Sequence, residues 1–248
     1  MKRIASLLLG LSLLIPSATF AQSLGEAIVQ GLGSITLSDQ QVAEYSRQAV
    51  AQMDAQNPVA GPNDPYMQRL NRIVARHRTI DGIPINYKVY LVKDVNAFAT
   101  ADGSVRVMKG LMDIMSDQEL LAVMGHEIGH VINKDSRDAM KAALRRSAIR
   151  TALASRSGAV GQLSRSQLGA LADGFLGARF SRQQETEADD YSYGFLKRNG
   201  YSVMPLATSF EKLAKLGGAR GPEFLSSHPN SANRAQRVRD RARREGIR

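Results

Sequence analysis

The pentapeptide His126-Glu127-Ile128-Gly129-His130 constrains this chain more than any other feature, because it lies inside a stretch with helical periodicity. Ser116 and Glu119 stand in the register of a capping box, which satisfies the first free N–H groups of a helix. Apolar residues then recur at helical spacing as far as Ile132. The sequence therefore predicts a buried, central helix that carries two histidines and a glutamate.

Histidines four residues apart lie on one face of a helix, so His126 and His130 can bind one zinc ion together. Glu127 is one step round the helix, where it can accept a proton from a zinc-activated water and pass it to a leaving amine. The pattern predicts metal-assisted hydrolysis of a peptide bond. The alternative is a pair of core histidines without a metal, which is disfavoured because buried polar groups need partners.

A catalytic zinc ion usually has three protein ligands and keeps one position for water. The obvious source of the third ligand is the segment 185–189, in a predicted helix that begins after Ser181 and ends near Arg198. Glu185 borders the apolar face of this helix, so it is the predicted ligand, although alone it would be taken for a solvated carboxylate. Asp189 lies one turn along, where it could hold a ligand histidine by its second ring nitrogen or assist proton transfer.

His228 precedes Pro229 in a polar loop before the last predicted helix. A histidine in such a loop is often only a surface residue. In a metallopeptidase it could instead donate a hydrogen bond to the developing oxyanion, or act as an inhibitory fourth ligand that leaves when substrate arrives. We keep His228 among the candidate catalytic residues with both roles open. His77 is predicted to be structural, inside a second helix.

The rest of the chain predicts a mostly helical α+β fold with a small antiparallel β-sheet beside the catalytic helix. Strands are expected at 85–92, 96–100 and 104–108, with a turn at 101–103. Further helices are expected at 38–56, 64–77, 205–216 and 231–245, and two loosely packed helices, joined near 157–161, within 139–178. The strand at 96–99 could pair with an extended substrate by edge addition, or could be an ordinary sheet strand.

Residues 1–21 have the plan of a cleavable secretory signal: Lys2 and Arg3, an apolar run to Ile15, and a small-residue site ending at Ala21. The apolar run is shorter than the roughly 20 residues that a membrane-spanning helix needs. We expect a flexible segment at 22–37 and one metallopeptidase domain at 38–248, located in the periplasm.

The chain has no cysteine, so neither a disulfide, a thiolate ligand nor lipid attachment through cysteine is expected. The formal net charge is +10, and +8 without the two basic residues of the predicted signal. No aromatic residues interleave with the arginine-rich stretches, which disfavours a nucleic-acid partner. The positive charge instead favours adhesion to anionic surfaces in the envelope.

Taken together, the motifs resemble those of HtpX-like zinc metallopeptidases and their periplasmic LoiP-like and BepA-like branch. The resemblance covers roughly residues 38–245 and is carried by Asn96-Ala97-Phe98-Ala99, Gly110-Leu111-Met112, His126 to His130, Phe180-Ser181-Arg182, Glu185 with Ala188-Asp189, and His228-Pro229.

This resemblance implies a gluzincin-type fold with one zinc ion held by His126, His130 and Glu185. It also implies Glu127 as the base, Asp189 as a supporting acid, and a regulatory or substrate-facing histidine at position 228. The family's role is protein quality control in the bacterial envelope. The chain departs from many envelope relatives in lacking the lipid-bearing cysteine, and from BepA-like proteins in lacking a repeat domain after the catalytic part.

We therefore expect a zinc-dependent endopeptidase that degrades misfolded or unfolded envelope proteins and associates, if at all, only peripherally with the outer membrane. The principal alternative is a non-proteolytic holdase or assembly factor with a latent or structural zinc site. A basic module that binds polyanions is a second alternative, and it would survive a chelator.

Overall fold

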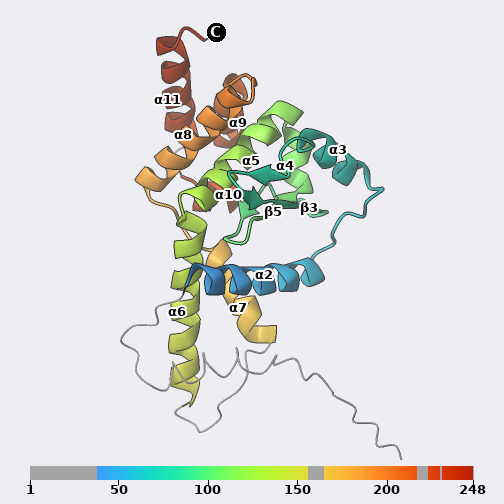
Figure 1. The fold of residues 1–248 in the computed structure, drawn as a ribbon, viewed down its shortest axis with the longest axis vertical. Coiled ribbons are helices and arrows are strands. Elements are labelled where there is room, and N and C mark those ends of the chain that lie inside the picture. The colour runs from blue at the N-terminus through green and yellow to red at the C-terminus, as the bar shows by residue number, and fades with distance from the viewer. Residues whose placement is uncertain (1–37, 156–164, 217–222, 230, 248) are drawn as a thin grey trace, which may run out of the picture.

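The computed structural model describes residues 38–155, 165–216, 223–229 and 231–247 (Figure 1). Its helices are α2 (Asp39–Gln56), α3 (Pro65–Ile73), α4 (Lys109–Ile114), α5 (Asp117–Ile132), α6 (Asp135–Ser155), α7 (Arg165–Leu176), α8 (Arg182–Arg198), α9 (Met204–Lys215), α10 (Glu223–Ser227) and α11 (Ser231–Arg244). Its strands are β1 (Thr79–Ile80), β2 (Ile83–Pro84), β3 (Asn86–Tyr90), β4 (Ala97–Ala99) and β5 (Ser104–Met108).

The predicted class, mostly helical with a small sheet beside the catalytic helix, is confirmed. The predicted signal at 1–21, the flexible segment at 22–37 and the link at 157–161 lie outside the described residues. Within the described part of the chain, no helix combines the length and apolarity needed to cross a membrane.

Serine side chains fix where three of the helices begin. Ser38, Ser116 and Ser181 each form the predicted capping box with the residue three positions on, opening α2, α5 and α8. Asp64 caps α3 ahead of Pro65, as predicted. The prediction that α3 extends to His77 is wrong, because the helix ends at Ile73 and His77 lies beyond it. The His77 ring is buried, with its Nε2 3.0 Å from the Tyr201 hydroxyl, in keeping with a structural role.

The three-stranded sheet has the order β3-β5-β4. β4 and β5 form the predicted antiparallel hairpin, closed by Asp102, whose carboxylate accepts from the Ser104 hydroxyl, and by Gly103 with a φ of 83°. The expectation of a wholly antiparallel sheet is wrong, because β3 pairs with β5 in parallel. The hairpin leaves the other edge of β5 free for β3, and the six residues 91–96 carry the chain from β3 past β5 to β4. β4 is left at the sheet edge, beside α5.

Two hydrophobic clusters cover opposite faces of the three-stranded sheet. The larger one contains α5, α8, α9 and α11, and α5 is buried along nearly its whole length. The smaller one joins α2, α6 and α7 to Tyr90, Phe98 and Met108 of the sheet. In Figure 1, α2 lies across the molecule at the level where α6 leaves it, with α7 beside α6.

Glycines let α8 approach α5 closely. A Cβ added at Gly129 would lie 3.0 Å from both the Cα and the carbonyl oxygen of Ala188, and one at Gly125 would lie 2.9 Å from the Ser192 hydroxyl. Backbone atoms cannot move aside without shifting the helix. Gly125 directly precedes the histidine motif and Gly129 lies inside it, so they set the distance between the residues that α5 and α8 bring to the site.

We expect Gly129→Ala to lower the free energy of unfolding by about 1–2 kcal/mol, because overpacking outweighs the gain in helix propensity. Denaturant unfolding of the two proteins measures this difference. Gly194→Ala is the matched control, since its Cβ would meet only the mobile guanidinium of Arg198. That variant should be neutral or slightly stabilised, and equal losses for both substitutions would contradict the packing argument.

A buried ion pair ties α2 to the sheet. Asp54 of α2 accepts from Arg106 Nε at 2.8 Å, from Lys88 Nζ at 2.7 Å and from the Tyr90 hydroxyl at 2.7 Å. Arg106 is only 2% exposed, so its charge has little help from solvent. Burial raises the pKa of Asp54, but the hydrogen bonds from its three partners outweigh burial and hold the pKa below its usual value.

Replacing Asp54 by Asn should lower the free energy of unfolding at pH 7 by about 3 kcal/mol, because the Arg106 charge loses its partner. The pKa of the Asp54 carboxyl group is lower in the folded state than in the unfolded state. The ion pair therefore stabilises the fold fully above the unfolded-state pKa of about 3.9, and this stabilisation is lost as the pH falls through the folded-state pKa. The difference between the two proteins should therefore shrink below about pH 4. Denaturation at pH 7 and pH 3 measures this difference. Asp240→Asn is the control, because Asp240 pairs with Arg243 at the surface, where an ion pair contributes little. A difference independent of pH would rule out the Asp54 carboxylate as its source.

Candidate metal centre and active site

The structure brings the predicted site residues from three elements into one buried cluster. α5 supplies His126, Glu127 and His130, α8 supplies Glu185, and the turn after α10 supplies His228. Each of these side chains is at most 3% exposed. His126, His130, Glu185 and His228 each offer one ligand atom, and these atoms lie within 4.8 Å of one another, a geometry that could hold one metal ion.

The ring nitrogens face inward. His126 Nε2 is 3.2 Å from both His130 Nε2 and His228 Nδ1. His228 Nδ1 is 2.8 Å from Glu185 Oε1, and His228 Nε2 is 3.6 Å from Glu127 Oε1. Glu127 therefore lies beside the cluster, at the position of a proton acceptor and not of a ligand.

Carboxylates orient the two histidines of α5 from outside. Asp189, one turn beyond Glu185, is 3.0 Å from His126 Nδ1, which matches the first of the two placements that the sequence allowed. Asp135, the first residue of α6, is 2.9 Å from His130 Nδ1 and also accepts from Gln184 at 2.9 Å. A carboxylate on the outer nitrogen leaves the inner nitrogen directed at the metal position.

Arg234 belongs to the site although the sequence patterns did not predict it. This arginine of α11 donates from Nε and a terminal nitrogen to Asp189, at 3.0 and 2.7 Å, and lies 2.5 Å from Glu185 Oε2. Its guanidinium also lies 4.0 Å above the Phe210 ring. Arg234 thus holds together the two carboxylates of α8 that face the histidines.

A signal for Arg234 exists in the sequence. The buried face of α11 consists of Ser231, Arg234, Ala235, Val238 and Ala242. An arginine at a core position of an amphipathic helix needs a buried carboxylate as its partner. The acidic residues of α8 could supply that carboxylate. Asp135 gives a weaker signal, since an acidic residue at the start of a helix is common for other reasons.

Burial and charge shift the protonation of the cluster in opposite directions. Burial lowers the pKa of His126 well below its usual value, and the charge of Arg234 lowers it further. Burial also lowers the pKa of His130, but its contacts with Asp135 and Glu185 outweigh burial and raise it to about 9.

The pKa of Glu127 is raised by burial, which keeps this carboxylate a good proton acceptor. Burial also raises the pKa of Glu185, but the hydrogen bonds with His130 and His228 outweigh burial and hold this pKa well below the usual range.

These residues fit a divalent cation. Four buried carboxylates, Glu127, Asp135, Glu185 and Asp189, face a single guanidinium, so with neutral histidines the site carries a net charge of −3. Glu127 Oε1 is buried and has no hydrogen-bond donor among the residues that the structure describes. Imidazole nitrogens with a carboxylate are the ligand set typical of zinc.

Aromatic rings close the cluster on two sides. Phe224 of α10 stacks on His228 with ring centroids 4.5 Å apart, and Phe180 stacks on His130 at 3.9 Å with the rings nearly parallel. The backbone N–H of Phe180 donates to the Ser227 carbonyl, which links the two covering segments. A water-poor surrounding strengthens the electrostatic interactions inside the site.

Comparison with known proteins agrees with this chemistry. Residues 63–242 match the model of peptidase family M48. Metalloprotease LoiP of Escherichia coli K12 is 50% identical over 213 residues, covering 86% of this chain and 84% of that protein. Metalloprotease YcaL of the same organism is 47% identical over 219 residues, covering 87% and 86%. The beta-barrel assembly-enhancing protease of E. coli K12 is more distant, 29% identical over 221 residues, which is 84% of this chain and 45% of that protein.

We expect Arg234→Met to destabilise the metal-free protein, because Asp189 and Glu185 would keep their buried charge without a counter-ion. A bound metal ion compensates Glu185, so the variant should lose less stability with zinc than without it. Its rise in Tm on adding zinc should therefore exceed that of the native chain, as measured by thermal unfolding with and without a chelator.

Arg237→Met provides the control, because Arg237 also lies on α11 but pairs with Asp190 at the surface. Its loss should cost less than about 1 kcal/mol, with no dependence on zinc. If Arg234→Met lost equal stability in both metal states, Arg234 would be a packing residue only.

Proposed function

Because the chain belongs to peptidase family M48 and is a metalloendopeptidase, we propose that it uses one zinc ion to hydrolyse misfolded or unfolded proteins of the bacterial envelope. The observation that carries the proposal is the convergence of His126, His130 and Glu185 beside Glu127. Three protein ligands with an adjacent carboxylate base form a hydrolytic zinc site.

In this proposal each residue has a distinct task. A bound zinc ion supplies the Lewis acidity that polarises the scissile carbonyl. Glu127 takes a proton from the attacking water as the water oxygen bonds to the carbonyl carbon. The same carboxyl group then returns the proton to the amine nitrogen as the C–N bond breaks. Asp189 and Asp135 hold the two histidines in position through their outer nitrogens.

His228 has the position of a fourth ligand in this conformation. Its Nδ1 lies within hydrogen-bonding distance of Glu185 Oε1 and 3.2 Å from His126 Nε2, at the place where water or substrate has to bind. We propose that this is a latent arrangement, which substrate opens by displacing His228. In this proposal the displaced ring donates to the developing oxyanion.

The edge of β4 supports an extended, unfolded substrate. Ladder bonds to β5 come from Asn96 and Thr100, so the N–H and C=O groups of Ala97 and Ala99 face away from β5. Within the described part of the chain, side chains bond two of these groups: Ala97 N–H donates to Asn96 Oδ1 and the Ala99 carbonyl accepts from the Ser136 hydroxyl. A peptide strand can replace both contacts, giving main-chain affinity without sequence preference.

The envelope location is proposed on the signal-like residues 1–21 and on relatives such as the beta-barrel assembly-enhancing protease, whose name links it to the assembly of β-barrels. We propose a periplasmic protein whose positive surface allows peripheral association with the outer membrane. Protein chains are its partners, as substrates, and nucleic acid is not.

One observation favours the alternative of a holdase with a structural metal. Structural zinc sites have four protein ligands, and His228 completes such a set here. Glu127 distinguishes the two functions, because a structural site has no use for a buried carboxylate without a donor.

The decisive measurement is degradation of casein, an unfolded protein, by the zinc-loaded protein beside its Glu127→Gln variant and a chelator-treated sample. We expect the variant to lose activity by at least about 10²-fold, because it lacks the general base. It should still bind zinc stoichiometrically, since Glu127 is not among the proposed ligands. Full activity in Glu127→Gln would exclude the proposed mechanism.

His228→Ala separates a latent peptidase from a holdase. If His228 blocks the fourth position, its removal should raise casein cleavage or reveal cleavage that the native chain lacks. If neither protein cuts casein while zinc is bound, and both suppress casein aggregation, the holdase becomes the better-supported function.

A further inference from the structure

A cavity of about 220 Å³ lies between the first turns of α8 and α11, beside the metal cluster. α8 contributes Arg182, Glu185 and Thr186 to its wall, and α11 contributes Asn233, Arg234 and Arg237. Glu185 belongs both to this wall and to the proposed ligand set. The cavity is smaller than the pockets that hold whole small molecules, so it suits one side chain or one end of a peptide.

Positive charge dominates the wall of the cavity. Three arginines and one carboxylate give its described lining residues a net formal charge of +2. That carboxylate, Glu185, is 2% exposed, and each of its oxygens already faces a nitrogen. Oε1 lies 2.8 Å from His228 Nδ1, and Oε2 lies 2.5 Å from Arg234 Nη1. The cavity therefore presents mainly guanidinium groups to a ligand.

Two donors on opposite walls are available to a ligand. Arg182 on α8 and Asn233 on α11 are exposed, and no residue that the structure describes bonds either side chain. Arg237 instead pairs with Asp190, which does not line the cavity, and donates to the Thr186 carbonyl at 3.0 Å. A ligand between the two helices can thus accept hydrogen bonds from Arg182 and Asn233 without breaking an existing contact.

The buried wall of the cavity adds further positive potential. Arg234 is 7% exposed, and its Nη1, although close to Glu185, makes no directed hydrogen bond within the described part of the chain. Nη1 carries two N–H groups, so it can also donate to a ligand. α8 and α11 both begin here, and the first turn of a helix has partial positive charge. These features favour an anion with oxygen acceptors.

We infer that this cavity binds a carboxylate group of the substrate chain, either its free C-terminus or an acidic side chain. The inference rests on the proposed peptidase function. A planar carboxylate can accept two hydrogen bonds from Arg182 and a third from Asn233. Because Glu185 connects the cavity to the metal cluster, the anchored residue lies close to the peptide bond that is cut. The cavity thereby selects which bond of an unfolded chain reaches Glu127.

Peptide binding tests the cavity without hydrolysis. Glu127→Gln protein is titrated with short fluorescent peptides, and fluorescence anisotropy gives each Kd. The reference peptide has an amidated C-terminus and no acidic residue. One derivative has a free C-terminus, and the others place a single Glu at successive positions, so the derivative that gains affinity identifies the source of the carboxylate. We expect that derivative to bind about five- to tenfold tighter than the reference, the effect of a charge-assisted hydrogen bond at a partly exposed site.

Arg182→Gln should abolish this gain and leave the affinity for the reference peptide unchanged. Asn233→Asp should also abolish it, because a carboxylate on the opposite wall repels the ligand. Arg198→Gln is the matched control, since it removes the same charge from an exposed position at the other end of α8, away from the cavity. That variant should keep the gain. Equal affinity of the native cavity for all peptides, or a gain that survives both cavity variants, would overturn the assignment.

Metal removal separates the cavity from the zinc position, because a carboxylate could also bind the metal ion. The gain should persist with a chelator, and a gain that disappears with the metal would refute the cavity as its source.

Cleavage of the favoured peptide by the chain with Glu127 intact gives a second readout. Arg182→Gln should raise KM by the same factor and leave kcat within about twofold, because Arg182 does not touch the reacting atoms. An unchanged KM contradicts the assignment. If casein degradation does not depend on Glu127, the proposed function fails, while the binding result still decides whether the cavity takes a carboxylate.

Discussion

The close approach of α5 and α8 is the constraint on which the site depends. Gly125 and Gly129 have no side chains, so the backbone of α8 packs directly against the turn of α5 that carries the histidines. Glu185 and Asp189 are one turn apart on α8 and therefore face His130 and His126 together. A wider separation would leave three ligands too far apart for one ion. The glycine inside the histidine motif thus has a packing role that is separate from the chemistry of its neighbours.

Buried negative charge is the second determinant. Four carboxylates in a nearly dry cluster cost solvation energy unless cations face them. Arg234 compensates part of this charge permanently, from a helix at the other end of the chain, and His130 takes up a proton readily for the same reason. The remaining excess is what a divalent ion satisfies. The site is therefore held in shape by the same electrostatics that recruits its metal.

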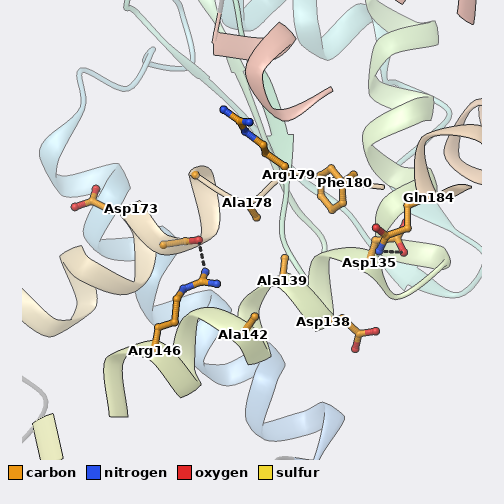
Figure 2. Close-up of a pocket in the computed structure, with 12 residues that line it drawn as sticks. Asp135, Asp138, Ala139, Ala142, Arg146, Asp173, Ala178, Arg179, Phe180 and Gln184 are labelled. Atoms are coloured by element: carbon orange, nitrogen blue, oxygen red, sulfur yellow. Dashed lines mark hydrogen bonds between the residues drawn. The ribbon is translucent and has the colours of Figure 1, made fainter. Parts of the chain in front are cut away.

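α6 connects the metal cluster to the rest of the molecule. Its first residues bond His130 through Asp135 and the β4 edge through Ser136, and its next turns form one wall of a cleft whose other wall is the segment 173–180 (Figure 2). The cluster, the edge strand and this cleft thus lie along one helix. In the proposed function this places the main chain of a substrate on the element that also orients His130.

The sequence by itself determined the local features. Capping boxes at Ser38, Ser116 and Ser181 fixed helix starts, and helical spacing put Glu185 and Asp189 on the inner side of α8, because these signals act within a few residues. The tertiary structure decided what depends on distant segments: β3 pairing in parallel with β5, His228 entering the ligand set, Arg234 bridging Asp189 and Glu185, and the cleft behind Phe180. Local patterns could mark Arg234 as a buried arginine and His228 as a candidate ligand, but they could not fix the partners, because these residues meet only when the helices pack.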